Sequence, residues 1–322
     1  MGIDRPDEDD APEPRDAAPT PEPDTPDGDR DLPVAGLDGA GPDGGADSEA
    51  AKAAYVLEYR AIVAAEYSSG DDPWSADRAA WDEALPELRE AWTEHERRYP
   101  HSERSQPTLE PDGSWRSGDL ELTAKRNAEV DHGCERIREI GEAVIIPGMR
   151  AVEAEDSSRC LVGFDHRFKG ADRLKEKVAD QLSARPNLTT TQALDLVPDV
   201  VRFTFQYDEG SYAAGMRKDV ERLEACGFIP LEHRDTWTSD QYRGINSRWQ
   251  EPESGLIFEV QFHTRISYEA KEITHKAYER IRSGAEDPEL TELKAFQGRV
   301  CAMIPLPSGD RTSKLPTGER DG

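Results

Sequence analysis

The sequence predicts an α/β or α+β domain around a mixed β-sheet, preceded by helices and an acidic tail. Between residues 159 and 282, segments of strand-like alternation take turns with segments of helical period, as such a domain requires. Predicted strands cover 159–168, 200–207 and 255–264, and predicted helices cover 171–184, 211–228 and 265–282. Residues 1–48 contain no Phe, Tyr, Trp or Cys, so they are expected to stay disordered.

The chain divides into four predicted regions. They are a disordered acidic tail (1–48), a helical N-terminal region (49–150), the mixed-sheet domain (151–304) and a disordered C-terminal tail (305–322). In the helical region, apolar spacing predicts helices at 49–67, 74–98 and about 120–144. Ser75 is expected to cap the second helix, and the sequence IIPGM is expected to end the third. Gly227 is expected to close the helix at 211–228.

The charge of the chain is uneven, which bears on its partners. The 322 residues carry a formal charge of −27. Residues 151–322 hold 24 Lys and Arg against 30 Asp and Glu, a net of −6, so residues 1–150 carry −21. Binding of nucleic acid by the whole chain normally needs a basic surface, so this acidity argues against it. A local basic pocket remains compatible with these numbers.

Four cysteines show no C-x-x-C spacing, which predicts free buried thiols in a reducing compartment. The sequence has no run of 18 apolar residues and no basic and apolar segments at its N-terminus. Neither a membrane span nor a classical signal peptide is therefore expected. Cytoplasm is the expected location, although a protein exported whole by a specialised secretion system would have the same features.

The segment 257–282 carries the most informative pattern. Its strand places polar side chains on one face and apolar ones on the other, namely Glu259, Gln261 and His263 opposite Phe258, Val260 and Phe262. The helix that follows carries one stripe of Lys271, His275, Tyr278 and Arg282. Glu259 is a candidate Mg²⁺ ligand or proton acceptor, and the alternative is an ordinary half-exposed strand. His263 and His275 have no neighbours at zinc-site spacing, so zinc is not expected.

A group of cations lies between a predicted strand end and the helix after it. Its members are Arg167, Lys169, Arg173 and Lys177. Phosphates need several donors from different directions, and a helix N-terminus favours anions, so this group is a candidate triphosphate clamp. The alternative is a solvated helix face with Glu176 and Asp180 as ion-pair partners, and the pattern alone favours that alternative.

Two further positions are candidates for nucleotide contacts. Asp199 at a strand start could hold Mg²⁺, although a strand cap or a structural ion pair explains it equally well. Tyr242 lies beside Gly244 in a loop-like stretch, where an open aromatic face could stack on a base. A loop tyrosine packed on the domain is the alternative.

In their order and spacing, residues 159–282 resemble the synthetase domain of RelA/SpoT-type alarmone synthetases. The matching positions are Arg167, Lys169 and Lys177; Asp199 and Arg202; Tyr242 and Arg243; Glu259, Gln261 and Thr264; and Glu269, His275 and Tyr278. The sequence departs from the family at Arg173 (usually Ser), His263 (usually Arg), Asn246 (usually His) and Val197 (usually Asp). Asp199 keeps the strand parity of the missing Asp. These departures are similar to a divergent branch that includes toxic small alarmone synthetases.

The resemblance implies an α+β, nucleotidyltransferase-like mixed sheet with flanking helices. It implies transfer of the β,γ-pyrophosphate of ATP to a ribose 3′-hydroxyl, usually of GDP or GTP, which makes the alarmones of the stringent response. The implied catalytic residues are Glu259, Asp199 and His275, with Mg²⁺ held by Asp199 and Glu259. The implied ATP contacts are Arg167, Lys169, Arg173, Lys177 and Arg202. The implied acceptor contacts are Tyr242, Asn246, Gln261 and His263.

Three functions stay open at this point. The first is alarmone synthesis, as a housekeeping enzyme or a toxin, on guanosine or adenosine nucleotides. The second is a toxin that pyrophosphorylates the 3′ end of tRNA, and the third is a catalytically dead nucleotide-binding module. The sequence has no His-Asp dipeptide, so synthesis without hydrolysis is expected. The helical region 49–150 would serve as a regulatory module, or bind a neutralising or delivery partner.

Overall fold

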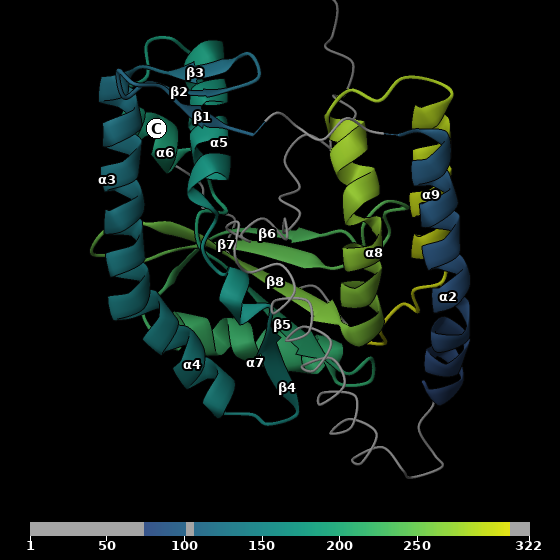
Figure 1. Ribbon diagram of the computed structural model, residues 1–322. Helices are drawn as coiled ribbons and strands as arrows, with labels where there is room; N and C mark the ends of the chain where they lie inside the picture. The colour runs from purple at the N-terminus through teal and green to yellow at the C-terminus, as the bar shows by residue number, and fades with distance from the viewer. Residues whose placement is uncertain (1–73, 101–105, 310–322) are drawn as a thin grey trace, which may run out of the picture. The chain divides into compact units, whose positions relative to one another are not determined.

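A computed structural model describes residues 74–100 and 106–309 of the chain (Figure 1). The predicted tail at 1–48, the predicted helix at 49–67 and residues 310–322 lie outside these ranges.

A five-stranded mixed sheet forms the centre of the fold, in the order β4-β5-β8-β7-β6 (Figure 1). The strands are β4 (Arg159–Val162), β5 (Arg202–Tyr207), β6 (Ile229–Asp235), β7 (Ile245–Gln250) and β8 (Ile257–Thr264). The central pair β5 and β8 is parallel, and all other neighbours are antiparallel. The prediction of an α+β fold with a mixed sheet is confirmed.

Five helices accompany the sheet. They are α5 (Ala171–Ala184), α6 (Thr190–Asp195), α7 (Tyr212–Ala225), α8 (Arg265–Arg282) and α9 (Glu289–Ala302). The helix after β8 starts at once because Thr264 and Ser267 form a capping box, in which each side chain accepts the other residue's backbone N–H. Gly227 has a φ of +89°, and the Phe228 N–H reaches back to the carbonyl of Leu223 at 3.2 Å. The predicted glycine stop is confirmed.

The residues before the sheet form helices and a small three-stranded sheet. Their elements are α2 (Ser75–Arg98), β1 (Thr108–Leu109), β2 (Trp115–Ser117), β3 (Leu120–Leu122), α3 (Ala124–Ile140), the π-helix η1 (Gly141–Ile145) and α4 (Ile146–Ala154). The helix predicted at 74–98 is confirmed, but Ser75 does not cap it, because Trp74 holds the cap position without a side-chain bond.

The third predicted helix is wrong at both ends. Its first residues, Leu120–Leu122, pair with β2 as a strand, and α3 begins after Thr123, whose side chain accepts the N–H of Arg126. The IIPGM sequence does not end the helical run either. Pro147 lies in the first turn of α4, just after the π-helix, so the run continues past it with a local change in the helical hydrogen-bond pattern.

Several elements have other bounds than the sequence predicts, and several were not predicted. The strand predicted at 159–168 stops at Val162, turns at Gly163 (φ +63°) and continues as the short 3-10 helix η2 (Phe164–His166). A single bridge then joins Phe168 to Val201. The sequence did not predict β6, β7, α6 or α9. Most residues of β6 are at least partly exposed, so it lacks the apolar alternation that marks a half-buried strand.

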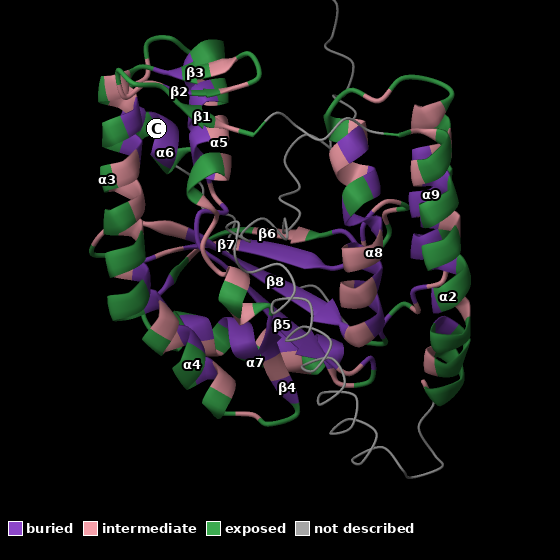
Figure 2. Cartoon of the chain, viewed as in Figure 1, coloured by how far each residue is buried: buried purple, intermediate pink, exposed green. Residues whose placement is uncertain are grey.

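One hydrophobic core joins α2 to the sheet. Trp81, Leu85 and Trp92 of α2 belong to the same buried cluster as Phe205 and Phe262 of the sheet. Strands β5 and β8 are buried along their length, whereas the outer faces of α2, α3 and α9 are exposed (Figure 2).

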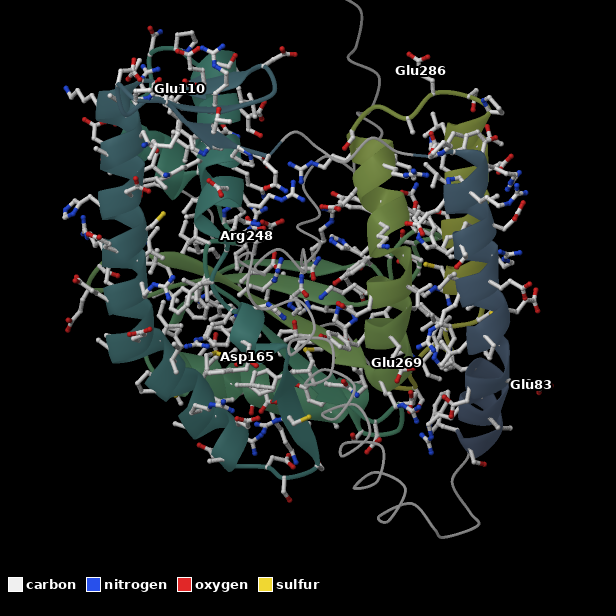
Figure 3. The ribbon with its side chains drawn as sticks, viewed as in Figure 1. Glu83, Glu110, Asp165, Arg248, Glu269 and Glu286 are labelled. Atoms are coloured by element: carbon white, nitrogen blue, oxygen red, sulfur yellow. The ribbon has the colours of Figure 1, made fainter. Side chains whose placement is uncertain are left out.

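A polar contact fixes α2 against α8. The Trp81 indole donates to Glu269 of α8 at 2.8 Å, and Glu269 is labelled in Figure 3. Residues 74–98 therefore contribute to the same core as the mixed-sheet domain.

All four cysteines lie in the described part of the chain and are free thiols, as predicted. Only Cys301 is buried, however, and Cys226 is exposed. Within residues 74–100 and 106–309, no helix combines the length and the apolar character needed to cross a bilayer.

Candidate active site

The three central strands carry one continuous polar face. Cα partners in register across β5 and β8 are Arg202 with Glu259, Thr204 with Gln261 and Gln206 with His263. Across β7 and β8, Asn246 pairs with Gln261 and Arg248 with Glu259. Register partners project to the same side of a sheet. We call these residues the polar face: Arg202, Thr204, Gln206, Asn246, Arg248, Glu259, Gln261 and His263.

The β8 part of the polar face is buried. The side chains of Glu259, Gln261 and His263 are at most 1% exposed. The alternative interpretation of this segment as an ordinary half-exposed strand is therefore wrong. Helix α8 contacts both β8 and β5, and it brings buried Lys271 and His275 to this region. Buried polar groups are costly unless they are hydrogen-bonded, so such a face needs internal partners or a ligand.

Asp199 lies just before β5, and three cationic side chains lie around its carboxylate. Its side chain is fully buried, with Lys169 Nζ 2.7 Å from Oδ2 and Lys177 Nζ 2.9 Å from Oδ1. Arg202 Nη1 lies 3.9 Å from Oδ2. Burial alone would raise the pKa of Asp199, but the charges of these three cations hold it well below its usual range. Asp199 is therefore ionised at neutral pH and fixes the two lysine ammonium groups.

Glu259 lies one strand away, as the register partner of Arg202. Its Oε1 accepts a hydrogen bond of 2.7 Å from Gln261 Nε2. Burial raises the pKa of Glu259 to about 7, the charge of Asp199 adds to this effect, and Arg202 and Lys271 oppose it. The fold thus brings the two predicted metal carboxylates close enough for the charge of Asp199 to act on Glu259.

Arg202, beside this pair, and Arg167, which contacts Arg202 through its backbone, have donors without acceptors among the described residues. The backbone N–H of Arg202 donates to the carbonyl of Arg167 at 2.8 Å, so the two residues are neighbours. The Arg167 guanidinium lies 4.5 Å from the centre of the Phe164 ring and donates to the Phe164 carbonyl. Arg167 Nε and Arg202 Nη1 are buried and have no hydrogen-bond acceptor among the described residues. Buried guanidinium donors without acceptors are suited to an anionic ligand.

Arg173 is placed differently from the other members of the predicted clamp. Its guanidinium donates to Glu279 of α8 at 2.9 Å and to Glu176 of its own helix at 3.2 Å. His275 Nε2 lies 3.8 Å from the same oxygen of Glu279. Arg173 therefore links α5 to α8, whereas Lys169 and Lys177 hold Asp199. The alternative interpretation, a solvated helix face, predicted the ion pair between Arg173 and Glu176.

Tyr242 does not present the open face that the sequence predicts. It is 6% exposed, and its hydroxyl donates to Asn246 Oδ1 at 2.9 Å. The same hydroxyl lies 2.7 Å from His263 Nε2. Asn246 belongs to β7 and not to the loop, and its Nδ2 is a buried donor without an acceptor among the described residues.

His263 is enclosed on all sides. Its Nδ1 lies 2.9 Å from Ser267 Oγ, so both ring nitrogens have partners. Burial holds the pKa of His263 well below its usual range, so the ring is neutral. A Cβ at Gly244 would lie 2.6 Å from the ring, which explains the glycine there. His263 supports Tyr242 and is too enclosed for the direct acceptor contact expected from the sequence.

Sequence reasoning missed three parts of this site. Thr204 and Gln206 alternate with apolar neighbours in the same way as Glu259 and Gln261, so the period of β5 could have revealed its polar face. Lys271 was placed in the helical stripe but was given no function. Arg248 pairs with Glu232 at 2.9 Å on the neighbouring strand and is labelled in Figure 3. No sequence signal connects those two residues.

The donor set limits which metals the site suits. Among residues 74–100 and 106–309, no group of three or more His, Cys, Asp or Glu side chains is arranged to hold a metal ion. The polar face and the segment before it offer two carboxylates, Asp199 and Glu259. Such a set suits a hard cation that takes its remaining ligands from water or phosphate.

Comparisons with known proteins find similarity only among solved structures. No family model and no curated protein matches it. The small alarmone synthetase 1 from Bacillus subtilis is 13% identical, with 54% of this chain and 92% of that chain covered and a TM-score of 0.39. A GTP pyrophosphokinase family protein from Streptococcus pneumoniae is 15% identical, with 56% and 89% covered and a TM-score of 0.38.

The small alarmone synthetase 2 from Bacillus subtilis is 11% identical, with 53% of this chain and 91% of that chain covered and a TM-score of 0.39. All three of these similarities have identities of 15% or less and TM-scores below 0.5.

Proposed function

We propose that the chain is an ATP-dependent pyrophosphokinase that acts on a nucleotide. The ribose 3′-oxygen of the acceptor forms a bond to the β-phosphorus of ATP, and the bond between that phosphorus and the α-β bridging oxygen breaks. AMP leaves, and the hydroxyl proton passes to Glu259. The observation that carries this proposal is the Asp199–Glu259 carboxylate pair beside Arg202, whose Nη1 is a buried donor without an acceptor among the described residues.

The cations around Asp199 would bind the triphosphate of ATP. Arg167 and Arg202 offer guanidinium donors that lack acceptors among the described residues, and Lys169 and Lys177 add two ammonium groups within 3 Å of Asp199. Phosphoryl chemistry depends mainly on positioning and charge stabilisation, which donors on several segments supply together. Arg173 would act less directly, through its link between α5 and α8.

Glu259 is the candidate general base. A base is most effective when its pKa lies near the working pH, and burial raises the pKa of Glu259 to about 7. Asp199 is held ionised by its cations, so the two carboxylates have different tasks. His275 lies beside Glu279 and would orient groups at the α8 side of the site.

Asp199 and Glu259 would hold a magnesium ion. Mg²⁺ commonly binds through one or two carboxylates plus substrate phosphates, and here the charge of Asp199 raises the pKa of Glu259, a repulsion that a cation would relieve. When bound, the ion would neutralise charge on the migrating phosphates.

The acceptor would be a guanosine nucleotide, with GDP or GTP expected from the family resemblance and an adenosine nucleotide as the alternative. Asn246 would contribute its unsatisfied Nδ2 donor to the acceptor. Tyr242 is held by its hydroxyl, so it would present a fixed ring edge. Gln261 is engaged with Glu259, and His263 stands behind Tyr242 as a support.

The experiment is a transfer assay with ATP labelled at the β- and γ-phosphates. The full-length chain and Mg²⁺ are incubated separately with GDP, GTP, ADP, AMP or bulk tRNA, and the products are separated. Label is expected in a guanosine tetra- or pentaphosphate, and it should disappear with Glu259→Gln. Label in tRNA alone would replace the acceptor by the tRNA 3′ end. No transfer by a folded chain to any acceptor would refute the proposal and leave a nucleotide-binding module.

A further inference from the structure

One buried cation near the site has no task in the transfer described so far. Lys271 projects from α8 and is 4% exposed. Its Nζ donates to Gln261 Oε1 at 2.9 Å, lies 4.0 Å from Glu272 Oε1 and lies 5.1 Å from the centre of the Tyr268 ring. Among the residues that the structure describes, the one close bond of this ammonium group to a side-chain oxygen goes to Gln261, on the polar face.

The Gln261 amide has two distinct ends with different partners. Its Oε1 accepts from Lys271 and, at 3.3 Å, from Thr204 Oγ1. Its Nε2 donates to Glu259 Oε1 at 2.7 Å. A flipped amide would place its NH₂ against the ammonium group and its oxygen against the carboxylate, so donors would face donors and acceptors would face acceptors. The Lys271 ammonium therefore excludes the flipped orientation.

We propose that Lys271 is a positioning residue for Glu259 that acts through the amide of Gln261. The ammonium fixes the carbonyl end, the NH₂ end then holds Glu259 Oε1, and Oε2 is left to accept the proton of the acceptor hydroxyl. Its catalytic consequence rests on the proposed pyrophosphate transfer, but the contact itself does not. A base held in one orientation loses less entropy on reaching the transition state, so the effect should fall on turnover.

A double-mutant cycle in the full-length chain tests this coupling. Lys271→Met keeps the length of the side chain and removes the donor, and it should lower kcat roughly tenfold with little change in the KM for ATP. In a Gln261→Leu background, Lys271→Met should cause a clearly smaller loss than in the wild-type background, because only the direct effect of its charge on Glu259 remains once the amide is gone. Independent, additive losses in kcat would overturn the proposal.

Two variants control for a merely structural role. Lys276→Met removes a lysine of the same helix whose ammonium pairs with Glu96 at the surface, and it should leave kcat unchanged. Gln261→Met keeps the length of the side chain and loses both the acceptor for Lys271 and the donor to Glu259, so it should lower kcat as much as Gln261→Leu. Full activity of folded Gln261→Met would overturn the proposal even if Lys271→Met failed to fold.

A second readout does not depend on activity. The side-chain NH₂ of Gln261, assigned by its disappearance in Gln261→Leu, should exchange slowly in the wild-type NMR spectrum. In Lys271→Met it should shift and exchange faster, whereas Lys276→Met should leave it unchanged. An unchanged Gln261 signal in Lys271→Met would refute the contact. A wild-type chain without transfer activity would instead refute the proposed function and leave this NMR result to decide on the contact.

Discussion

Replacing Glu259 with glutamine should remove turnover and yet make the folded protein less sensitive to alkaline pH. The substitution is nearly isosteric, and the new side-chain oxygen can still accept the hydrogen bond from Gln261 Nε2. The carboxylate that accepts the proton is lost, so transfer should fall by two or more orders of magnitude, the scale of a general base. Wild-type transfer rates in a folded variant would exclude Glu259 as the base.

The size of the stability effect follows from the pKa of Glu259, which burial raises from 4.5 to about 7. A group with a raised pKa in the folded state contributes stability below its unfolded pKa, and this contribution is lost as the pH rises through the folded pKa. The full shift corresponds to about 3 kcal/mol, of which about 2 kcal/mol falls between pH 5 and pH 7.5. Glutamine does not titrate, so this loss should be absent in the variant.

Urea unfolding of both proteins at pH 5 and pH 7.5 measures the effect. Effects of the substitution that do not depend on pH cancel when the difference between variant and wild type is compared at the two pH values. Glu121→Gln serves as a control, because Glu121 is exposed on β3. The difference in the free energy of unfolding between Glu259→Gln and wild type would stay constant between the two pH values only if Glu259 titrates normally. Such a result would remove the basis for assigning Glu259 as a base with a pKa near neutral pH.

Three further changes test other parts of the site. Tyr242→Phe loses the hydroxyl bond to Asn246, so it should lower the free energy of unfolding by about 1 kcal/mol in urea titrations, and an unchanged value would show that the hydroxyl bond is not made. Asp199→Asn leaves Lys169 and Lys177 without their shared carboxylate, so it should destabilise the fold by about 3 kcal/mol at pH 7 and by much less at pH 2; equal losses at both pH values would contradict the ion pairs. Removal of Mg²⁺ with EDTA should abolish transfer and leave the circular dichroism spectrum unchanged, and transfer that survives EDTA would exclude the metal.

The sequence by itself determined the elements whose pattern is local. The strand and helix across 257–282 change from a period of two to a helical period within a few residues, and the capping box at Thr264 lies at the point of change. The end of α7 at Gly227 could also be predicted, because this type of helix end needs only the glycine and the apolar residue after it. The helix expected from Leu120 failed because Leu120–Leu122 is held as a strand by pairing with β2.

Only the tertiary structure decided how the candidate site is assembled. Alternation in β8 predicted that Glu259, Gln261 and His263 share a face, but only the packing of α8 shows that this face is buried. The parallel pairing of β5 and β8, which brings Asp199 and Glu259 together, joins segments about 60 residues apart in the sequence. The pKa of Glu259 and the enclosure of Tyr242 depend on burial and on distant charges. A local pattern cannot encode either of them, because both arise when separate segments exclude water together.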